Sequence, residues 1–316
     1  MLNLALKHHE KFDLLIQSTS AEERSTRVAE ILREAGTQVN QNVVFCFNEV
    51  ISSIQDAKDD FLANYSLKQS KMLPFDCELL NVENGIKSFC QNFKSAQALT
   101  TEKKILIDIS TFIKPYFYCL LKLLKQECNI QEIYITYTEP ASYGRPLGES
   151  FAFTRGLDHV GEIPSFHGFA DIDKRNMLVI MLGFEGQRAL EVLRSVQPDK
   201  TLVINGFPAY RSEFKDVSLI SNKNVIREGE CLPELRFSSA SDPFETYRTL
   251  EKLYSDWSES YNFSLAPLGP KPMALGACLF ALQHDDARIL YAYPQGYVQK
   301  VAEKYGKTWM YEIFIE

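Results

Sequence analysis

Three hydroxyl residues and an arginine follow the first apolar run of the sequence. Ser18, Thr19 and Ser20 come directly after FDLLIQ, and Arg24 lies a few residues further on. Hydroxyl groups and free backbone N–H groups at the start of a helix bind anions such as phosphate, because the helix dipole is positive there. The four residues are therefore candidates for an anion-binding site. Alternatively, Ser20 simply caps the helix, and Glu23 completes a capping box.

A second stretch of the same kind, LGFEGQR, ends at Arg188. Its glycines, Gly183 and Gly186, permit a tight turn and close approach of a ligand. Glu185 lies between them and would repel phosphate. Its carboxylate suits a ribose hydroxyl, a base edge or proton transfer, which makes it a candidate catalytic residue. Alternatively, it is an acidic residue that stabilises the N-terminus of a helix.

A glycine- and proline-rich turn, APLGPKPMALG, precedes an apolar helical pattern near the end of the chain. It contains Gly269 and presents Lys271 just before the helix, and Pro272 suits a first helical position. The dipeptide Lys114-Pro115 stands in the same context earlier in the chain. Both lysines are therefore candidate phosphate ligands.

Other residues suggest chemistry with less support from their surroundings. Asp108 ends the apolar run ILID and is a candidate nucleophile or metal ligand, although an aspartate at such a place also caps helices. A polar set in the middle of the chain has two interpretations. Its members form a lid or an acid–base pair, or they are ordinary surface residues: Arg155, Asp158, His159 and His167.

Several common site motifs are missing from the sequence. The five histidines have no metal-ligand spacing and no CxxC pair occurs, so we predict no metal and no cofactor. There is no GxxxxGK[ST] loop, no GxGxxG after the first strand and no GxSxG elbow. These absences argue against the common nucleotide hydrolases, dinucleotide-dependent dehydrogenases and α/β-hydrolases.

The composition is that of an ordinary folded protein. With 316 residues, 45% of them hydrophobic and 24% charged, the chain is long enough for two domains. A net charge of −7 argues against bulk nucleic-acid binding. The sequence has no signal-peptide or membrane-spanning run, and its seven scattered cysteines are typical of reduced thiols. We therefore expect a cytoplasmic protein without membrane contact.

Short apolar runs alternate with helical patterns along most of the chain, which is typical of parallel β-α-β construction. We expect strands at 12–18, 43–48, 78–82, 105–109, 133–137, 177–182, 201–205, 235–238, 263–266, 288–292 and 310–315. We expect helices at 21–35, 51–67, 113–126, 243–257 and 273–282. The segment 141–175 breaks this pattern and is predicted to be a linker that crosses the surface.

The two halves of the sequence match strand by strand, which predicts a duplication. The matched positions are Arg24 with Arg188, Asn48 with Asn205, Leu79 with Arg236, Lys114 with Lys271, and Tyr143 with Tyr297. We therefore predict an α/β protein of two tandem Rossmann-like, flavodoxin-like units with mainly parallel sheets, related by a pseudo-twofold axis. The predicted domains are 1–140, the linker 141–175, and 176–316.

The predicted architecture places the candidate residues at the carboxyl ends of the parallel strands. In open parallel sheets, ligands bind outside the carboxyl ends of the strands. Four repeated cations fall there: Arg24, Lys114, Arg188 and Lys271. If the two units pair, these cations would line one cleft, which suits a ligand with several phosphates.

The turn around Gly269, Pro270 and Lys271 resembles that of the CARF family, and of the related SAVED domains with two fused CARF-like units. CARF domains are Rossmann-like sensors of cyclic oligonucleotides. The resemblance implies that the loops after the first and fourth strands contact such a ligand, and that the protein acts in antiviral defence. Two departures stand out: Pro270 replaces a hydroxyl residue, and Phe112 and Ile113 precede Lys114 where the family has glycine.

Three functions from different classes follow as hypotheses. The first is a sensor that binds a multiply phosphorylated, nucleotide-like ligand between its two units and reports it through a protein partner or a homo-oligomer. The second is a nucleotide-processing enzyme of hydrolase or glycosidase type that uses Glu185 or Asp108. The third is a non-catalytic scaffold subunit, which large apolar patches in the linker would favour.

Overall fold

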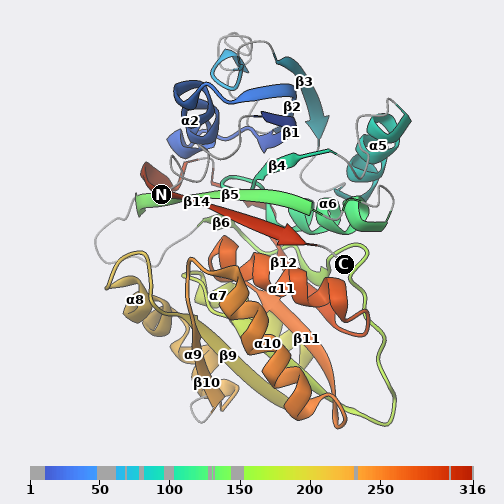
Figure 1. The fold of residues 1–316 in the computed structure, drawn as a ribbon. Helices are drawn as coiled ribbons and strands as arrows, with labels where there is room; N and C mark the ends of the chain where they lie inside the picture. The colour runs from blue at the N-terminus through green and yellow to red at the C-terminus, as the bar shows by residue number, and fades with distance from the viewer. Residues whose placement is uncertain are drawn as a thin grey trace. The chain divides into compact units, whose positions relative to one another are not determined.

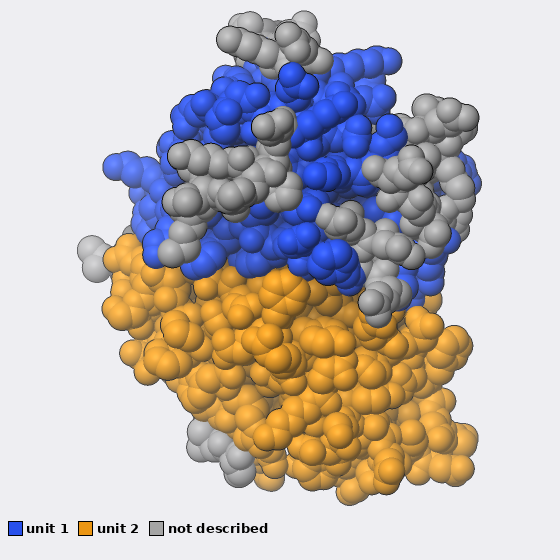
Figure 2. Space-filling model, viewed as in Figure 1, with its two compact units in different colours: residues 1–144, 299–316 blue, residues 145–298 orange. Residues whose placement is uncertain are grey.

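The chain forms two compact units, Met1–Gly144 with Gln299–Glu316, and Arg145–Val298 (Figure 1, Figure 2). The structure, a computed structural model, describes residues 11–47, 62–67, 70–77, 82–95, 103–126, 130, 132–143, 153–230, 234–298 and 300–314. Each unit contains a six-stranded sheet that is mainly parallel and carries helices. The predicted fold class, an α/β protein of two Rossmann-like units, is confirmed.

The sheet of unit 1 has the strand order β14-β5-β4-β1-β2-β3, and β14 alone runs antiparallel to its neighbour. The described elements of unit 1 are β1 (Lys11–Ser18), η1 (Glu23–Ser25), α2 (Arg27–Ala35), β2 (Gln38–Phe47), β3 (Lys71–Cys77), α5 (Val82–Ser95), β4 (Ile105–Asp108), α6 (Lys114–Gln126), β5 (Glu132–Tyr143) and β14 (Ala302–Phe314).

The sheet of unit 2 repeats this order as β7-β12-β11-β8-β9-β10, again with one antiparallel edge strand, β7. The described elements of unit 2 are β6 (Thr154–Arg155), β7 (His159–Glu162), β8 (Arg175–Met181), α7 (Gly186–Val196), β9 (Lys200–Gly206), α8 (Phe214–Ser221), α9 (Lys223–Glu228), β10 (Leu235–Ser238), α10 (Pro243–Trp257), β11 (Tyr261–Pro267), α11 (Lys271–Gln283), β12 (Arg288–Tyr293) and β13 (Gly296–Tyr297). A shared order of six strands supports the predicted duplication.

The edge strands place the unit boundaries differently from the prediction. Residues 302–314 follow unit 2 in the chain, but β14 pairs with β5 and belongs to unit 1. The predicted linker contains β6 and β7, which pair with β13 and β12 of unit 2. Each sheet is thus completed by an antiparallel edge strand that comes later in the chain than the parallel strands of the other unit. Strand β7 follows β5 of unit 1 and joins the sheet of unit 2, and β14 follows β12 of unit 2 and joins the sheet of unit 1. Sequence periodicity does not reveal such pairing, because the partner strands are far apart in the chain.

The third strand of unit 1 was also misplaced. We expected it at 78–82, whereas β3 spans Lys71–Cys77. Pro74 lies inside this strand and interrupts its strand-like sequence pattern. A proline is tolerated there because β3 is an edge strand of the described sheet. Most of the helix expected at 51–67 lies outside the described residues.

Both faces of the unit 2 sheet are covered by helices. Leu178 and Ile180 of β8 pack against α7 through Ala189 and Leu193. The whole run from Met177 to Met181 is buried. Strands covered on both faces read as continuous apolar runs, which explains why MLVIM marks the centre of a parallel sheet. Helices α10 and α11 pack side by side on the sheet (Figure 1).

Candidate functional site

The loops after the first and fourth parallel strands meet in unit 1, as the strand order requires. β1 lies between β2 and β4, and their carboxyl ends form the point where the strand order reverses. The Ser18 and Thr111 hydroxyls lie 2.9 Å apart, and Thr111 also donates to the Ser18 carbonyl at 3.2 Å. Ser18 is therefore at the predicted place, but its hydroxyl joins two loops.

The equivalent loops of unit 2 approach even more closely. A Cβ on Gly269 would lie 2.9 Å from the carbonyl oxygen of Leu182, and a Cβ on Gly183 would collide with the carbonyl of Leu268. The two predicted glycines thus come together, each because the other loop leaves no room for a side chain. The structure gives these glycines a packing role at the predicted ligand end of the sheet.

Thr19 and Ser20 are also engaged inside unit 1. The Thr19 hydroxyl donates to the Phe45 carbonyl at 3.2 Å and accepts from the Phe47 amide at 3.1 Å. The Ser20 hydroxyl accepts from the Glu22 amide at 3.2 Å, which forms a local turn. Helix η1 begins after Glu22 without a side-chain cap, so the capping box of Ser20 and Glu23 is not formed.

Arg24 lies in a buried cluster rather than at an open anion site. Its side chain is 7% exposed, and its Nε donates to the Glu22 carboxylate at 2.7 Å. A second nitrogen donates to the Thr138 carbonyl of β5 at 3.2 Å, and the guanidinium lies 6.0 Å from the ring centre of Tyr137. Burial disfavours the charged guanidinium, but the Glu22 carboxylate together with the Tyr137 and Tyr143 side chains outweighs it, so the pKa of Arg24 is raised.

Arg188 repeats this arrangement in unit 2. It donates to the Glu185 carboxylate at 3.0 Å and to the Ala292 carbonyl of β12, and it lies 5.1 Å from the ring centre of Tyr291. Burial opposes its charge, but the Tyr291 and Glu185 side chains outweigh this, so the pKa of Arg188 is raised. We call each set of arginine, glutamate and tyrosine of the last parallel strand, β5 or β12, an arginine cluster.

The glutamate of each arginine cluster holds the segment that the other half of the chain supplies. Glu185 Oε1 accepts from the amides of Phe153 and Thr154 at 2.9 Å each, and from the Thr154 hydroxyl at 2.7 Å. Glu22 Oε1 accepts from the Ala302 amide at 3.2 Å. Thr154 pairs with Tyr297, and Ala302 pairs with Tyr143. The arginine clusters therefore hold β6 and β14 in place.

Sequence reasoning missed the roles of Tyr137 and Tyr291, although a signal was present. Tyr137 and Tyr291 have the same separation in sequence as the matched pair Tyr143 and Tyr297. Burial raises the pKa of both Tyr143 and Tyr297, so both phenols are neutral. The matched tyrosines Tyr143 and Tyr297 thus lie near the arginine clusters, since Arg24 and Arg188 each lower the pKa of one of them against the effect of burial.

Lys114 and Lys271 are the predicted cations that begin helices. Each is the first residue of the helix after the fourth parallel strand, α6 or α11, and each is followed by proline. Neither helix has an acidic residue in its first turn. This is an unusual choice, because a cation at the positive end of a helix dipole is unfavourable.

Asp108 is buried and forms a local turn with Ser110. Its Oδ1 accepts from the Ser110 amide at 3.1 Å and from the Ser110 hydroxyl. The Thr136 hydroxyl also donates to this oxygen, at 3.4 Å. Asp108 therefore holds the turn between β4 and α6, and it does not cap a helix, because α6 begins only at Lys114.

The asparagine match is wrong. Ile16 pairs with Val43 in unit 1, and its counterpart Ile180 pairs with Val203 in unit 2, so the sheet register makes Phe45 the counterpart of Asn205. Asn48 lies outside the described residues. Asn205 is buried, and its amide donates to the Lys215 carbonyl at 3.1 Å.

The polar residues of the predicted linker are dispersed in unit 2. His159 contacts Asp158 at 2.8 Å and stacks on Tyr293, whereas His167 contacts Glu162 at 2.8 Å. Arg155 lies on β6. Among the described residues, no three His, Cys, Asp or Glu side chains gather in a metal-binding arrangement.

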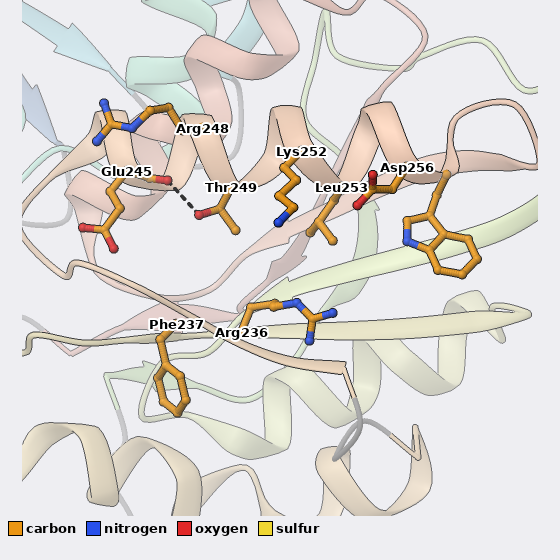
Figure 3. Close-up of a pocket in the computed structure, with 9 residues that line it drawn as sticks. Arg236, Phe237, Glu245, Arg248, Thr249, Lys252, Leu253 and Asp256 are labelled. Carbon is orange, nitrogen blue, oxygen red and sulfur yellow. Dashed lines mark hydrogen bonds between the residues drawn. The ribbon is translucent and has the colours of Figure 1, made fainter.

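A groove of about 420 Å³ lies between β10 and α10 (Figure 3). Lys252 and Leu253 point from α10 toward β10. The groove is lined by Arg236, Phe237, Glu245, Arg248, Thr249, Lys252, Leu253, Asp256 and Trp257. Arg236 pairs with Glu234 at 3.0 Å and Arg248 approaches Asp242 at 3.7 Å, so the charges largely compensate one another. The groove is not a concentrated anion site.

Comparison with known proteins places the chain in no family. No family model matches it, and no curated protein matches. One similar solved structure is a functionally unknown protein, PA1789 from Pseudomonas aeruginosa PAO1, with 9% identity, coverage of 90% of this chain and 93% of that chain, and a TM-score of 0.27. Another is the cytoplasmic domain of a prokaryotic cation chloride cotransporter, with 8% identity, coverage of 92% and 98%, and a TM-score of 0.28. At such TM-scores neither likeness supports a conclusion about fold or function.

A search of the described residues for a helix long and apolar enough to span a membrane finds none.

Proposed function

We propose that this protein is a non-catalytic sensor that binds a phosphate-bearing, nucleotide-like ligand at the carboxyl ends of its parallel strands. Lys271 is the principal contact in unit 2, and Lys114 has the same position in unit 1. Arg24 and Arg188 are structural in this proposal, because both guanidinium groups are held inside their arginine clusters.

The repeated lysine at the start of α6 and α11 carries the proposal. A charge of the wrong sign at a helix end costs roughly 0.3–1 kcal/mol. The same placement occurs in both units, at helices whose first turns contain no acidic residue. A bound anion would remove this cost, since it interacts favourably with the lysine and with the helix dipole.

The enzyme alternative loses its two candidate residues. Both oxygens of Glu185 accept hydrogen bonds from within unit 2, and Oδ1 of Asp108 holds the turn after β4. A general base needs a lone pair directed at its substrate. These carboxylates are committed to the fold, so a binding function is the better interpretation.

The resemblance to CARF and SAVED domains suggests which nucleotides to test first. Cyclic oligonucleotides carry several phosphates and would engage the Gly269-Pro270-Lys271 turn. A role in antiviral defence would follow if one of them binds.

A thermal-shift panel tests this function. Cyclic di-, tri- and tetranucleotides, mononucleotides, dinucleotide cofactors and inorganic tripolyphosphate are compared on wild type and on Lys271→Ala. A ligand at a hundred times its Kd stabilises the folded state by about 2.7 kcal/mol, which raises Tm by roughly 5–11 °C for a unit of this size. We expect a hit that Lys271→Ala abolishes. A matched control is Lys252→Ala, an exposed lysine that lines the groove between β10 and α10. A panel without shifts on folded protein, or a hit that survives Lys271→Ala, refutes the proposal.

A second candidate function, a protein-binding scaffold, is favoured by one observation. Phe169 is 77% exposed and Ile172 is 96% exposed, both within the predicted linker. Their loop is well anchored, because Asn262 bonds to the Asp171 amide at 2.8 Å and to the Asp171 carbonyl at 2.9 Å. Sedimentation velocity tests self-association through this loop: a sedimentation coefficient that depends on concentration in wild type and not in Phe169→Ser/Ile172→Ser would support it.

A further inference from the structure

Strand β10 forms one edge of the unit 2 sheet, and no described strand lies on its outer side. The Ser238 carbonyl accepts from the amide of Phe207, which directly follows β9, at 2.7 Å. Backbone groups alternate between the two sides of a strand, so Arg236, like Ser238, directs its groups toward β9. Leu235 and Phe237 therefore direct their N–H and C=O groups outward. Such an edge is a template for another strand.

The usual protection of a sheet edge is incomplete at β10. Natural proteins protect edges with charged side chains. The Arg236 guanidinium donates to the outward Leu235 carbonyl at 3.4 Å, which is a long bond, and the Arg236 side chain is 44% exposed. An amide of an added strand can replace this bond, because Arg236 also donates to Glu234 at 3.0 Å and keeps that partner.

Two half-exposed aromatic rings lie beside this edge on one face of the sheet. The Ser238 hydroxyl contacts that of Thr246 in α10 at 2.8 Å, so the side chains of Ser238 and Arg236 face α10. Phe237 therefore lies on the opposite face, 45% exposed. Its ring centre is 6.1 Å from that of Phe207, which is 52% exposed. Exposed rings in contact indicate an interaction surface, because aromatic side chains contribute strongly to interfaces.

The groove between β10 and α10 lies on the other face, that of Arg236 (Figure 3). Lys252 points from α10 toward β10, and it forms no ion pair within the described part of the chain. Glu245 lies two turns before Lys252 on α10, and Asp256 lies one turn after it. The middle of the groove thus suits one acidic side chain, whereas Glu245 and Asp256 would repel such a side chain at the two ends.

We propose that β10 binds an extended segment of another protein as an added antiparallel strand. The segment presents apolar side chains to Phe237 and Leu235, and one acidic side chain between them to Arg236 and Lys252. Side chains directly opposite one another in an antiparallel pair lie on the same face, so this alternation matches both faces of the edge. Main-chain hydrogen bonds supply the affinity, and the alternate side chains supply the specificity. The proposal is independent of the nucleotide site.

NMR titration of the full chain compares three capped pentapeptides: Thr-Val-Glu-Val-Thr, its lysine counterpart Thr-Val-Lys-Val-Thr, and the glutamate peptide with both valine amides N-methylated. The net charge of −7 favours the lysine peptide in any nonspecific binding. We expect the glutamate peptide to bind more tightly than the lysine peptide by roughly 2- to 30-fold, because lysine turns a favourable cross-strand charge pair into an unfavourable one. The N-methylated peptide should not bind, because it lacks the N–H groups that face β10.

Hydrogen exchange locates the added strand. In the free protein the outward amides of Leu235 and Phe237 should exchange faster than those of Arg236 and Ser238, which face β9. The glutamate peptide should slow exchange at Leu235 and Phe237 by about tenfold when about 90% of the protein is bound. Exchange at Arg236 and Ser238 should stay as it is without peptide.

Two sets of variants test the two faces of the edge. Lys252→Glu should reverse the preference, so that the lysine peptide binds more tightly than the glutamate peptide. Its matched control is Lys223→Glu, an exposed lysine of α9 that does not line the groove. Phe207→Ser/Phe237→Ser should weaken both peptides, and Phe169→Ser, at a more exposed phenylalanine, should weaken neither.

Four results would overturn the proposal in protein that circular dichroism shows to be folded. The first is no binding of the glutamate peptide up to about 5 mM. The second is equal binding of the N-methylated peptide, and the third is a preference for glutamate that survives Lys252→Glu. The fourth is a wild-type dimer in sedimentation velocity that Phe207→Ser/Phe237→Ser converts to a monomer, since a second copy would then occupy the edge. None of these results bears on the nucleotide site, which the thermal-shift panel tests.

Discussion

Replacement of Glu185 by glutamine tests whether the arginine cluster of unit 2 is structural. Glu185 accepts from four groups: the Phe153 amide, the Thr154 amide and hydroxyl, and the Arg188 guanidinium. Glutamine is nearly the same size but offers one acceptor oxygen and no charge. Its amide group would face either the Arg188 guanidinium or the backbone amides, which are all donors.

The expected loss of stability is large. The Arg188 and Glu185 side chains are 13% and 15% exposed, so the pair is close to fully buried. Removal of one partner from a buried ion pair costs about 3–5 kcal/mol, because the remaining charge stays in a poorly solvated place. For a unit of this size each kcal/mol lowers Tm by about 2–4 °C, so we expect a decrease of roughly 6–20 °C.

Thermal unfolding followed by circular dichroism measures this change, and hydrogen exchange locates it. The amides of Phe153 and Thr154 should exchange faster in Glu185→Gln, because they lose their acceptor. The control is Glu191→Gln on the surface of α7, where the carboxylate accepts from Gln187 at 2.6 Å and a change within about 0.5 kcal/mol is expected. A Tm within about 2 °C of wild type, with exchange unchanged at both amides, would contradict the structural role.

Three further predictions concern packing, titration and a turn. Gly183→Ala should destabilise unit 2 by about 1–3 kcal/mol, since the new methyl group collides with the Leu268 carbonyl. Urea unfolding measures this change. The control is Gly85→Ala in α5, where no atom lies within 4 Å of the added Cβ and a gain in stability of about 0.5–1 kcal/mol is expected. Burial raises the pKa of Glu139 above its usual value although Trp309 donates to it at 2.6 Å, so the folded state binds the proton more tightly and stability falls as pH rises through this pKa. Glu139→Gln should therefore raise Tm at neutral pH and remove this part of the pH dependence; a variant that melts below wild type at neutral pH would contradict it. Asp108→Asn should cost about 1–2 kcal/mol, because a neutral amide oxygen accepts the two Ser110 hydrogen bonds less strongly than a carboxylate does, and loss of ligand binding without loss of stability would count against this structural role.

Local signals were sufficient to predict many of the elements. Helix α10 spans Pro243–Trp257 as expected, because Asp242 caps it through the Phe244 amide at 2.9 Å and a proline occupies its first position. Helix α2 ends before Gly36, whose φ of 69° is accessible to glycine at little cost. These features depend on residues that are close together in the sequence, so the sequence alone predicts them.

The strand-end position of the candidate site also followed from the sequence. Once the alternation of strands and helices predicted parallel sheets, the loops after the first and fourth strands had to lie at the carboxyl edge. The structure brings Gly183 against Leu268 and joins Ser18 to Thr111 at that edge.

The sequence by itself thus determined the α/β class, the repeated unit and the edge of the sheet at which the candidate residues lie. Only the tertiary structure decided that two of the four predicted cations, Arg24 and Arg188, are held inside their units. Arg24 and Arg188 look like phosphate ligands in the sequence, but each donates to a carbonyl of β5 or β12, more than a hundred residues away, and to Glu22 or Glu185. The assignment of β14 to unit 1 has the same origin. Burial and pairing between distant segments are properties of the packed chain, and no local sequence pattern predicts them.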